Sequence, residues 1–368
     1  MKRPKLSVCM IVKNEERHIV RCLESVQHIA DEIIVVDTGS NDRTEDICRS
    51  FHAKVYHHKW EQDFSKARNA GLQHVKGEWI LILDADEELD HDTGSLLPSL
   101  LTDDSLPSLG CMKVVNYTGK QWDENEAFEQ RQFRLIRNQR NITFTGRVCE
   151  RPEGEEASAA FSLPCIIHHY GYLEQEAQRK HKRNMSLLNA ALLTSSADAF
   201  FLYHKAAEYD RGNEQDKALR LSVDSISKCK RKKQIPPPAF YYLKYKLLID
   251  TKRYEEAARD INEALAHYPD YCTLHYYKGI IMYQLKKVRE AITAFEACLQ
   301  ADSDNYPYIQ VKGAADFRSS CWLGVCYAEL HQPMTAVLYV KKALKANPKC
   351  SRAQRLFTEL TKDQAVHA

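Results

Sequence analysis

The stretch that decides the fold is Glu78-Trp79-Ile80-Leu81-Ile82-Leu83-Asp84-Ala85-Asp86, a short apolar run that ends in two carboxylates. The run has the length and composition of a buried β-strand. Because side chains alternate along an extended chain, Asp84 and Asp86 are expected on the same side of the strand end. Carboxylates aimed at one point repel unless a cation lies between them, and Mg²⁺ or Mn²⁺ is the natural occupant. The strand end is a candidate site for a nucleotide diphosphate, with a solvated strand end or a helix cap as the alternative.

Length and composition describe a globular protein. The chain has 368 residues, of which 44% are hydrophobic and 28% charged, and its formal charge is +2. This length predicts two or three domains, and the low net charge gives no general attraction to nucleic acid. No apolar run reaches the ~18 residues of a membrane-spanning helix. The 12 cysteines show no metal-binding spacing. They predict reduced, buried thiols and a cytoplasmic location.

Strand-like and helix-like segments alternate at the start of the chain. The strand-like segments are residues 6–12, 32–36, 53–57 and 79–83, and the helix-like segments begin at Asn14-Glu15-Glu16, Thr44 and Asp63. This alternation predicts a mostly parallel sheet with covering helices, in which ligands bind beyond the carboxyl ends of the strands. Polar clusters at 14–15, 37–42 and 84–86 follow three of these strands. All three are therefore expected on one rim.

The next segments are less regular. Residues 111–115, 133–137 and 164–169 look like strands, and residues 122–129 look like an acidic loop. Residues 176–198 form a charged helical connector that carries Arg179, Lys180 and Arg183. These cations are candidates to close over a diphosphate, although a solvated linker is the simpler explanation.

The C-terminal half changes to helical repeats. Small residues expected at helix–helix contacts are Ala218, Ala257, Ala291 and Ala336, with spacings of 39, 34 and 45. The segment Leu323-Gly324…Tyr327…Ala336…Ala343…Pro348 has the order of a tetratricopeptide (TPR) repeat. Residues 302–315 look like an insertion between the third and fourth units. Stacked helix pairs offer a concave groove for a peptide or protein segment, although the repeats are equally suited to form a homodimer.

Four motifs of the N-terminal half occur in the order and spacing of a known family. They are residues 6–16, 33–42, 63–71 and 84–86, and together they resemble the nucleotide-sugar half of a family 2 glycosyltransferase with the GT-A fold. Residues 131–135, 144–150 and 169–172 resemble a bacterial subgroup with appended helical repeats, the sublancin-type S-glucosyltransferases. That subgroup usually has His-Glu where this chain has Cys149-Glu150, so the chain lacks that imidazole at this position.

The resemblance implies roles for the polar clusters. Asp37 would contact the uracil or ribose of a UDP-sugar, or else cap the turn that follows it. Asp86 would bind the divalent metal, Mn²⁺ or Mg²⁺, directly. Asp84 would orient the ribose or a metal-bound water, and His169 would complete the metal shell or serve only in packing. Glu87, beside Asp86, is expected to be solvated.

Two further pairs are assigned to nucleotide binding. Asn14 and Glu15 are expected to open the first helix, whose N-terminus favours polar and anionic ligands. Plain helix capping is the alternative for both. Arg68 and Asn69 would touch the nucleotide or brace Asp84, with a surface ion pair as the alternative.

Inverting glycosyl transfer needs a general base to accept the acceptor proton. Glu150 is the first candidate, and Asp123 and Glu124 in the acidic loop are the alternatives. A cysteine acceptor would need less help from a base, because a thiol ionises more easily than a hydroxyl.

These observations predict a GT-A domain over residues 1–175, a connector over 176–198 and TPR-like repeats over 199–368. The expected function is metal-dependent, inverting transfer from a UDP-sugar to a peptide or protein side chain held by the repeats. Two alternatives remain: transfer to a lipid-linked or cell-surface glycan, and a TPR binding scaffold with weak or no turnover.

Overall fold

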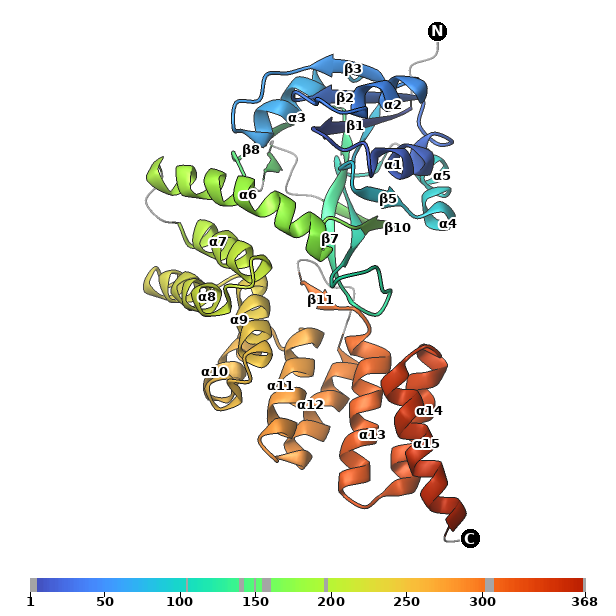
Figure 1. Cartoon of the computed structure of the whole chain (residues 1–368), viewed down its shortest axis with the longest axis vertical. Helices are drawn as coiled ribbons and strands as arrows, with labels where there is room; N and C mark the ends of the chain where they lie inside the picture. Colours follow the sequence, from blue (N-terminus) through green and yellow to red (C-terminus); the bar gives the residue numbers. More distant parts are fainter. Residues whose placement is uncertain are drawn as a thin grey trace. The chain divides into compact units, whose positions relative to one another are not determined.

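The computed structural model describes residues 5–103, 105–138, 142–148, 150–153, 160–194, 198–301 and 308–366. The chain folds as two compact units (Figure 1), of which one comprises residues 1–123 with 130–191 and the other residues 124–129 with 192–368. The first is α/β and the second is helical, as the sequence predicts. The helix α6 (Glu174–Thr194) covers most of the predicted connector. The domain limits at 175 and 198 stay a prediction.

The first unit is built on one large sheet. Its strands follow the order β3-β2-β1-β4-β7-β6-β10-β5. They are β1 (Leu6–Val12), β2 (Glu32–Asp37), β3 (Lys54–His57), β4 (Trp79–Ile82), β5 (Glu87–Leu89), β6 (Leu109–Tyr117), β7 (Ala127–Arg137) and β10 (Ala160–His169). The strands β3, β2, β1 and β4 are parallel, so their carboxyl ends share an edge. The polar clusters that follow β1, β2 and β4 lie at that edge, as the alternation of strands and helices predicts.

Alternate side chains of the sheet pack into two cores. On one face Val8 and Val35 pack with Leu23 of α1 (Ile19–Val26), and the short helices α2 (Thr44–Ser50), α4 (His91–Gly94) and α5 (Leu97–Leu100) follow β2 and β5. On the other face Cys9 and Ile34 pack with Leu72 of α3 (Phe64–Leu72). A two-stranded sheet of β8 (Thr143–Thr145) and β9 (Arg151–Glu153) completes the unit. Both faces of the central strands are therefore buried, which explains their continuous apolar sequence.

Two sequence-based boundaries are wrong. The first helix begins at Ile19 and not at Asn14, whose φ of 56° is left-handed and therefore not helical. Asn14 and Glu15 lie in the loop between β1 and α1. The segment 122–129 is not wholly a loop, because β7 begins at Ala127.

Among its described residues, the helical unit has four α-helix pairs and a final helix, α15 (Ser351–Val366). The pairs are α7 (Ala199–Arg211) with α8 (Gln215–Arg231), α9 (Pro238–Asp250) with α10 (Tyr254–His267), α11 (Cys272–Gln284) with α12 (Val288–Gln300), and α13 (Ser319–Glu329) with α14 (Pro333–Ala346). The four alanines predicted at the helix contacts lie on the second helix of each pair and have no exposed surface. Each is preceded, five positions earlier, by a residue with a left-handed φ in the turn: Asn213, Lys252, Lys286 and His331. The same turn and contact therefore recur at the uneven spacing read from the sequence.

The predicted insertion is partly described. Residues 302–307 lie outside the described part of the chain. Beyond them, β11 (Gln310–Val311) pairs with Phe128 and Glu129, which belong to the same unit, and the π-helix η1 (Ala314–Arg318) follows. The Thr273 hydroxyl donates to Gln310 Oε1 at 2.7 Å and fixes this segment to α11.

Two global expectations are met within the described residues. Their cysteines are unpaired thiols, and all except Cys350 are buried. No described helix combines the length and the apolar character that a membrane crossing requires.

Candidate active site

Asp84 and Asp86 lie in the turn between β4 and β5, and each has its own cation. Asp84 Oδ1 accepts from Arg68 Nη2 at 2.8 Å, and Arg134 Nη1 is 3.9 Å from its Oδ2. Asp86 Oδ2 forms an ion pair with Lys180 of α6 and lies 3.4 Å from His169 Nε2. Each carboxylate therefore has its own cationic partner, supplied by a side chain from a distant segment of the sequence.

These partners keep both aspartates ionised. Burial raises the pKa of Asp84, but Arg68 and then Arg134 outweigh burial and lower it to about 2. Burial likewise opposes ionisation of Asp86, whereas Lys180 and His169 hold its pKa well below its ordinary value. Both side chains are charged at neutral pH, and each is paired with a cationic side chain.

Arg68 connects Asp84 with the first candidate base. Its side chain is buried, and its Nε donates to Glu150 Oε1 at 2.7 Å. Burial disfavours the guanidinium charge, but Asp84 and Glu150 outweigh burial and raise the pKa of Arg68 above its ordinary value. The sequence-based expectation that Arg68 braces Asp84 is confirmed, and the alternative of a surface ion pair is wrong.

Glu87 is fully buried, so the expectation that it is solvated is wrong. Arg134 Nη2 donates to Glu87 Oε1 at 2.5 Å, and the backbone N–H of Asp84 donates to Glu87 Oε2 at 2.9 Å. Burial is the main cause of a raised pKa for Glu87, and Arg134 opposes it. Glu87 therefore fixes the backbone of the turn that presents Asp84.

His169 is oriented by a buried amide. Its Nδ1 lies 2.8 Å from Asn116 Oδ1, which can only accept, so Nδ1 carries a proton and the ring is fixed with Nε2 facing Asp86. Gly171 packs against this pair: an added Cβ would lie 2.1 Å from Asp86 Oδ2 and 2.6 Å from His169 Nε2. A histidine held in this way by a second residue is typical of metal sites.

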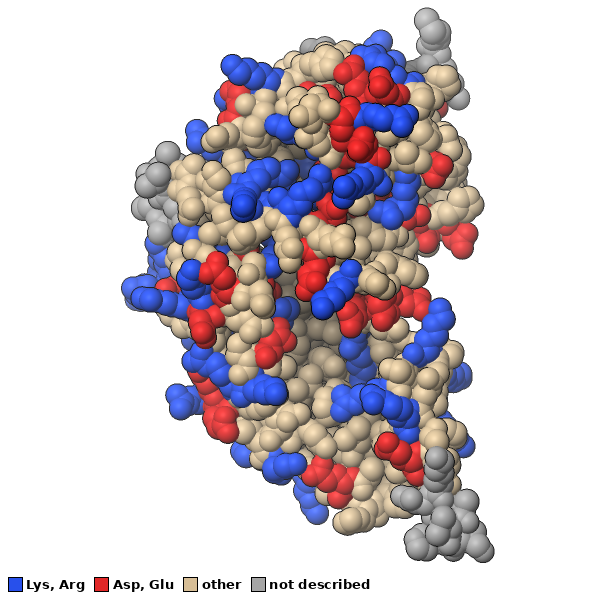
Figure 2. Space-filling model, viewed as in Figure 1, with Lys and Arg blue, Asp and Glu red and all other residues tan. Residues whose placement is uncertain are grey.

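Asn14 and Glu15 are held by α6. Arg179 Nη1 donates to the Asn14 carbonyl at 2.9 Å, and its Nη2 donates to both carboxylate oxygens of Glu15 at 3.1 Å. Burial raises the pKa of Glu15, partly offset by Lys180. In Figure 2, Lys and Arg side chains gather in a band over α6. The charged helix is thus part of the site and not a solvated linker.

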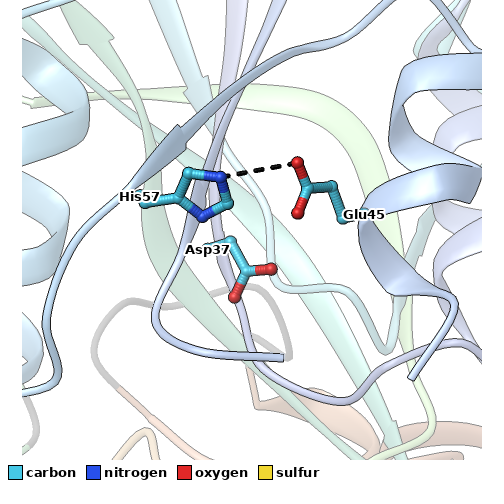
Figure 3. A group of neighbouring side chains, drawn as sticks. All are labelled: Asp37, Glu45 and His57. Atoms are coloured by element: carbon cyan, nitrogen blue, oxygen red, sulfur yellow. Dashed lines mark ion pairs between the residues drawn. The ribbon is translucent and has the colours of Figure 1, made fainter. Parts of the chain in front are cut away.

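Asp37 lies at the end of β2 beside two residues that sequence reasoning missed, Glu45 and His57 (Figure 3). Asp37 Oδ1 accepts from the backbone N–H groups of Gly39 and Ser40 at 2.8 and 2.7 Å, so the turn cap is real. His57 is the register partner of Asp37 on β3, and its Nε2 is 3.4 Å from Glu45 Oε1. That spatial pairing follows from strand order, which a single sequence does not encode.

In the described part of the chain, Asp37, Glu45 and His57 form a group of possible metal ligands. Their ligand atoms lie within 4.8 Å of one another. Glu45 Oε1 already accepts from Arg49 at 2.7 Å, and the His57 side chain is 63% exposed. A metal there would compete with Arg49 for Glu45 and would bind an exposed imidazole. This group is better suited to hydrogen bonds with a polar ligand.

The other residues that the sequence predicts for the site lie in different places in the chain's structure. Both ends of the Asn69 amide bind the backbone of Phe144, at 2.8 and 2.9 Å, so Asn69 fixes β8. Glu124 belongs to the helical unit, where Lys349 is 2.9 Å from its Oε1. Asp123 is the last residue of its segment in the first unit. Cys149 lies outside the described residues, so its replacement of the histidine stays a sequence observation.

Comparison with known proteins assigns the first unit. Residues 7–153 match the model of glycosyl transferase family 2. The N-terminal unit is a family 2 glycosyltransferase domain. It is followed by TPR-like helices.

Two curated proteins are similar to a large part of the chain. A TPR repeat-containing protein of Synechococcus elongatus is 30% identical over 275 residues, which are 72% of this chain and 64% of that protein. The SPbeta prophage-derived glycosyltransferase SunS of Bacillus subtilis is 27% identical over 237 residues, 62% of this chain and 54% of that protein. The chain thus spans less than two thirds of either relative. Among solved structures, YrrB, a TPR protein with an unusual peptide-binding site, is 16% identical with a TM-score of 0.40, over 49% of this chain and 84% of that one.

The residues around Asp86 suit the divalent metal that the glycosyltransferase family implies. Mg²⁺ and similar ions are commonly held by one or two carboxylates, with substrate phosphates and water as the other ligands. Asp86 offers a charged oxygen, and His169 offers an imidazole nitrogen whose orientation Asn116 fixes. Asp84 is engaged by two arginines. It is therefore better suited to orient the ribose or a metal-bound water than to bind the ion directly.

Proposed function

We propose that the chain is an inverting, metal-dependent glycosyltransferase that moves a sugar from a UDP-sugar to a peptide or protein side chain. The observation that carries this proposal is the Asp86–His169–Asn116 arrangement at the carboxyl edge of the sheet in a family 2 domain. A buried carboxylate and an oriented imidazole form a cation site where the fold places nucleotide ligands.

The donor site has a nucleoside end and a diphosphate end. Asp37, with Glu45 and His57 beside it, borders the nucleoside end, where carboxylate and imidazole groups accept and donate hydrogen bonds to uracil or ribose. At the other end Asp86 and His169 hold the metal, and Arg68 and Arg134 keep Asp84 fixed beside it. When bound, a divalent ion neutralises negative charge on the departing diphosphate.

Glu150 is the proposed general base. Because it shares Arg68 with Asp84, its carboxylate lies next to the residue that borders the donor site. A base has to reach the acceptor proton within hydrogen-bond distance, and Arg68 fixes Glu150 in one position for that purpose. Glu124 is a weaker candidate, since Lys349 binds its carboxylate in the helical unit.

The helical unit supports a polypeptide acceptor. Stacked TPR-like pairs bind extended or helical segments in a concave groove. The resemblance of residues 131–135, 144–150 and 169–172 to the sublancin-type S-glucosyltransferases favours a peptide acceptor. The match to the glycosyltransferase SunS covers only 54% of that protein. A lipid-linked or cell-surface glycan is the second acceptor class, and homodimerisation or a scaffold role is the second use of the repeats.

The test is transfer of label from radioactive UDP-sugars with Mn²⁺ to two pools: peptides that contain Ser, Thr or Cys, and a lipid-linked glycan fraction. Asp86→Asn is compared with Asp92→Asn, which removes a carboxylate that is 98% exposed. Label in peptide that requires Asp86 supports the proposal, and label in the glycan fraction supports the alternative acceptor. Equal, background label in both pools for all variants would favour the scaffold.

A further inference from the structure

Lys180 occupies the position that a metal on Asp86 would need. Its ammonium pairs with Asp86 Oδ2, the same oxygen that faces His169 Nε2 at 3.4 Å. The pair is shielded, with 19% of the Lys180 side chain and 5% of the Asp86 side chain exposed. The backbone of Gly171 closes one side, since a Cβ there would also lie 3.1 Å from Lys180 Nζ. The ammonium and a metal held by Asp86 and His169 would therefore be drawn to the same oxygen.

The lysine has an electrostatic reason to be there. Asp86 is a buried carboxylate whose Oδ2 faces His169 Nε2 at 3.4 Å. A buried carboxylate charge needs a cationic partner close to it. Lys180 supplies that charge in the absence of any ligand, and a divalent ion bound by Asp86 and His169 would supply the same charge.

We propose that Lys180 and the divalent metal compete for Asp86, and that the nucleotide diphosphate relieves the competition by giving Lys180 a new anionic partner. This inference rests on the proposed donor site. It follows that the metal alone binds weakly, that metal and UDP strengthen each other's binding, and that Lys180 increases this mutual effect. Because coupling between two ligands is reciprocal, either ligand can be titrated to measure it.

The exchange requires movement of one side chain and not of the helix. Arg179 fixes α6 to Glu15 and to the Asn14 carbonyl, and Glu176 lies 3.2 Å from His18 on the same side. Leu187 and Leu188 of α6 are buried. Lysine has a flexible four-carbon stem and a compact charge. Its ammonium can therefore move from Asp86 to a nearby phosphate while the helix backbone stays in place.

The test measures Mn²⁺ affinity by electron paramagnetic resonance, with and without UDP, after correction for Mn²⁺–UDP association in buffer. Lys180→Met is compared with Lys182→Met, which removes the same charge from an exposed position on the same helix. We expect Lys180→Met to bind Mn²⁺ alone about tenfold more tightly than Lys182→Met, as suits a shielded ion pair. In Lys180→Met, the increase in Mn²⁺ affinity that UDP causes should be smaller than in Lys182→Met by a similar factor. Equal affinities for the two variants would overturn the inference.

A second measurement uses the wild-type chain, in case loss of Lys180 impairs folding. Acetylation of Lys180, followed by mass spectrometry, should be slow without ligands, faster with Mn²⁺ alone and slow again with Mn²⁺ and UDP. An acetylation rate that Mn²⁺ leaves unchanged would overturn the competition. This holds provided that Mn²⁺ binds the wild type and that Asp86→Asn weakens this binding. If the wild type binds neither Mn²⁺ nor UDP, the proposed donor site itself fails.

Discussion

Arg68 donates from Nε to Glu150 Oε1 across 2.7 Å, although 82 positions separate the two residues in the sequence. The same guanidinium donates to Asp84 Oδ1 at 2.8 Å. One buried cation thus holds the proposed base and the first aspartate of the D-x-D motif in a fixed relation. The geometry of the site depends on this residue more than on any interaction within the motif itself.

Replacement of Arg68 by Met should therefore destabilise the first unit. Glu150 and Asp84 would lose the guanidinium that they share, although Arg134 would stay 3.9 Å from Asp84. Removing one member of a buried ion pair costs about 3–5 kcal/mol. The free energy of unfolding in urea measures the effect. Arg151→Met is the control, because its ion pair with Glu153 is exposed and worth less than about 1 kcal/mol. Similar losses for both variants would contradict the bridging role of Arg68.

Glu150→Gln should lower kcat by about 100-fold or more while donor binding stays close to that of the wild type. The amide keeps the size of the side chain but accepts no proton. A pH–rate profile separates this role from a structural one, since the limb that reports the base should disappear. Glu124→Gln and Asp123→Asn are the comparison variants, and a larger kcat loss in either would assign the base to it.

The ion pairs of Asp84 should persist in mild acid. Its pKa is lowered from an ordinary 3.8 to about 2, because Arg68 and Arg134 outweigh burial. A depressed pKa means that the stabilisation is complete above the ordinary pKa and is lost as pH falls through the lowered one. The difference in unfolding free energy between the wild type and Asp84→Asn should be constant from pH 7 to about 4 and shrink below that. A decline that begins between pH 7 and 5 would be inconsistent with this.

Gly171→Ala should damage the metal site, because the new Cβ would lie 2.1 Å from Asp86 Oδ2. We expect Mn²⁺ affinity to fall by at least about tenfold, as for other disturbances of groups that orient metal ligands. Gly279→Ala is the matched control: its Cβ would meet Phe295 at 2.4 Å in the helical unit. That variant should lose thermal stability but keep its Mn²⁺ affinity. The opposite pattern would show that Gly171 has no special relation to the site.

The sequence predicts the sheet edge well and its charge pairing poorly. The apolar run before Asp84 is a local pattern that predicts a strand. The small residues of the repeats are a local pattern that predicts helices and the contacts between them. In contrast, Lys180 lies 94 positions from Asp86, and nothing local connects them. Glu87 looks solvated because its partner, Arg134, comes from another strand. Asn14 looks like a helix start because its left-handed φ leaves no trace in a hydrophobic pattern.

The most direct test of the account is a calorimetric donor panel of UDP-glucose, UDP-GlcNAc, UDP-galactose and GDP-mannose, each with Mn²⁺ and with chelator. Wild type, Asp86→Asn and Asp92→Asn are compared. We expect Mn²⁺-dependent binding of a UDP-sugar that is lost in Asp86→Asn and kept in Asp92→Asn. Binding of no donor in the presence of Mn²⁺, or binding that Asp86→Asn leaves unchanged, would contradict it.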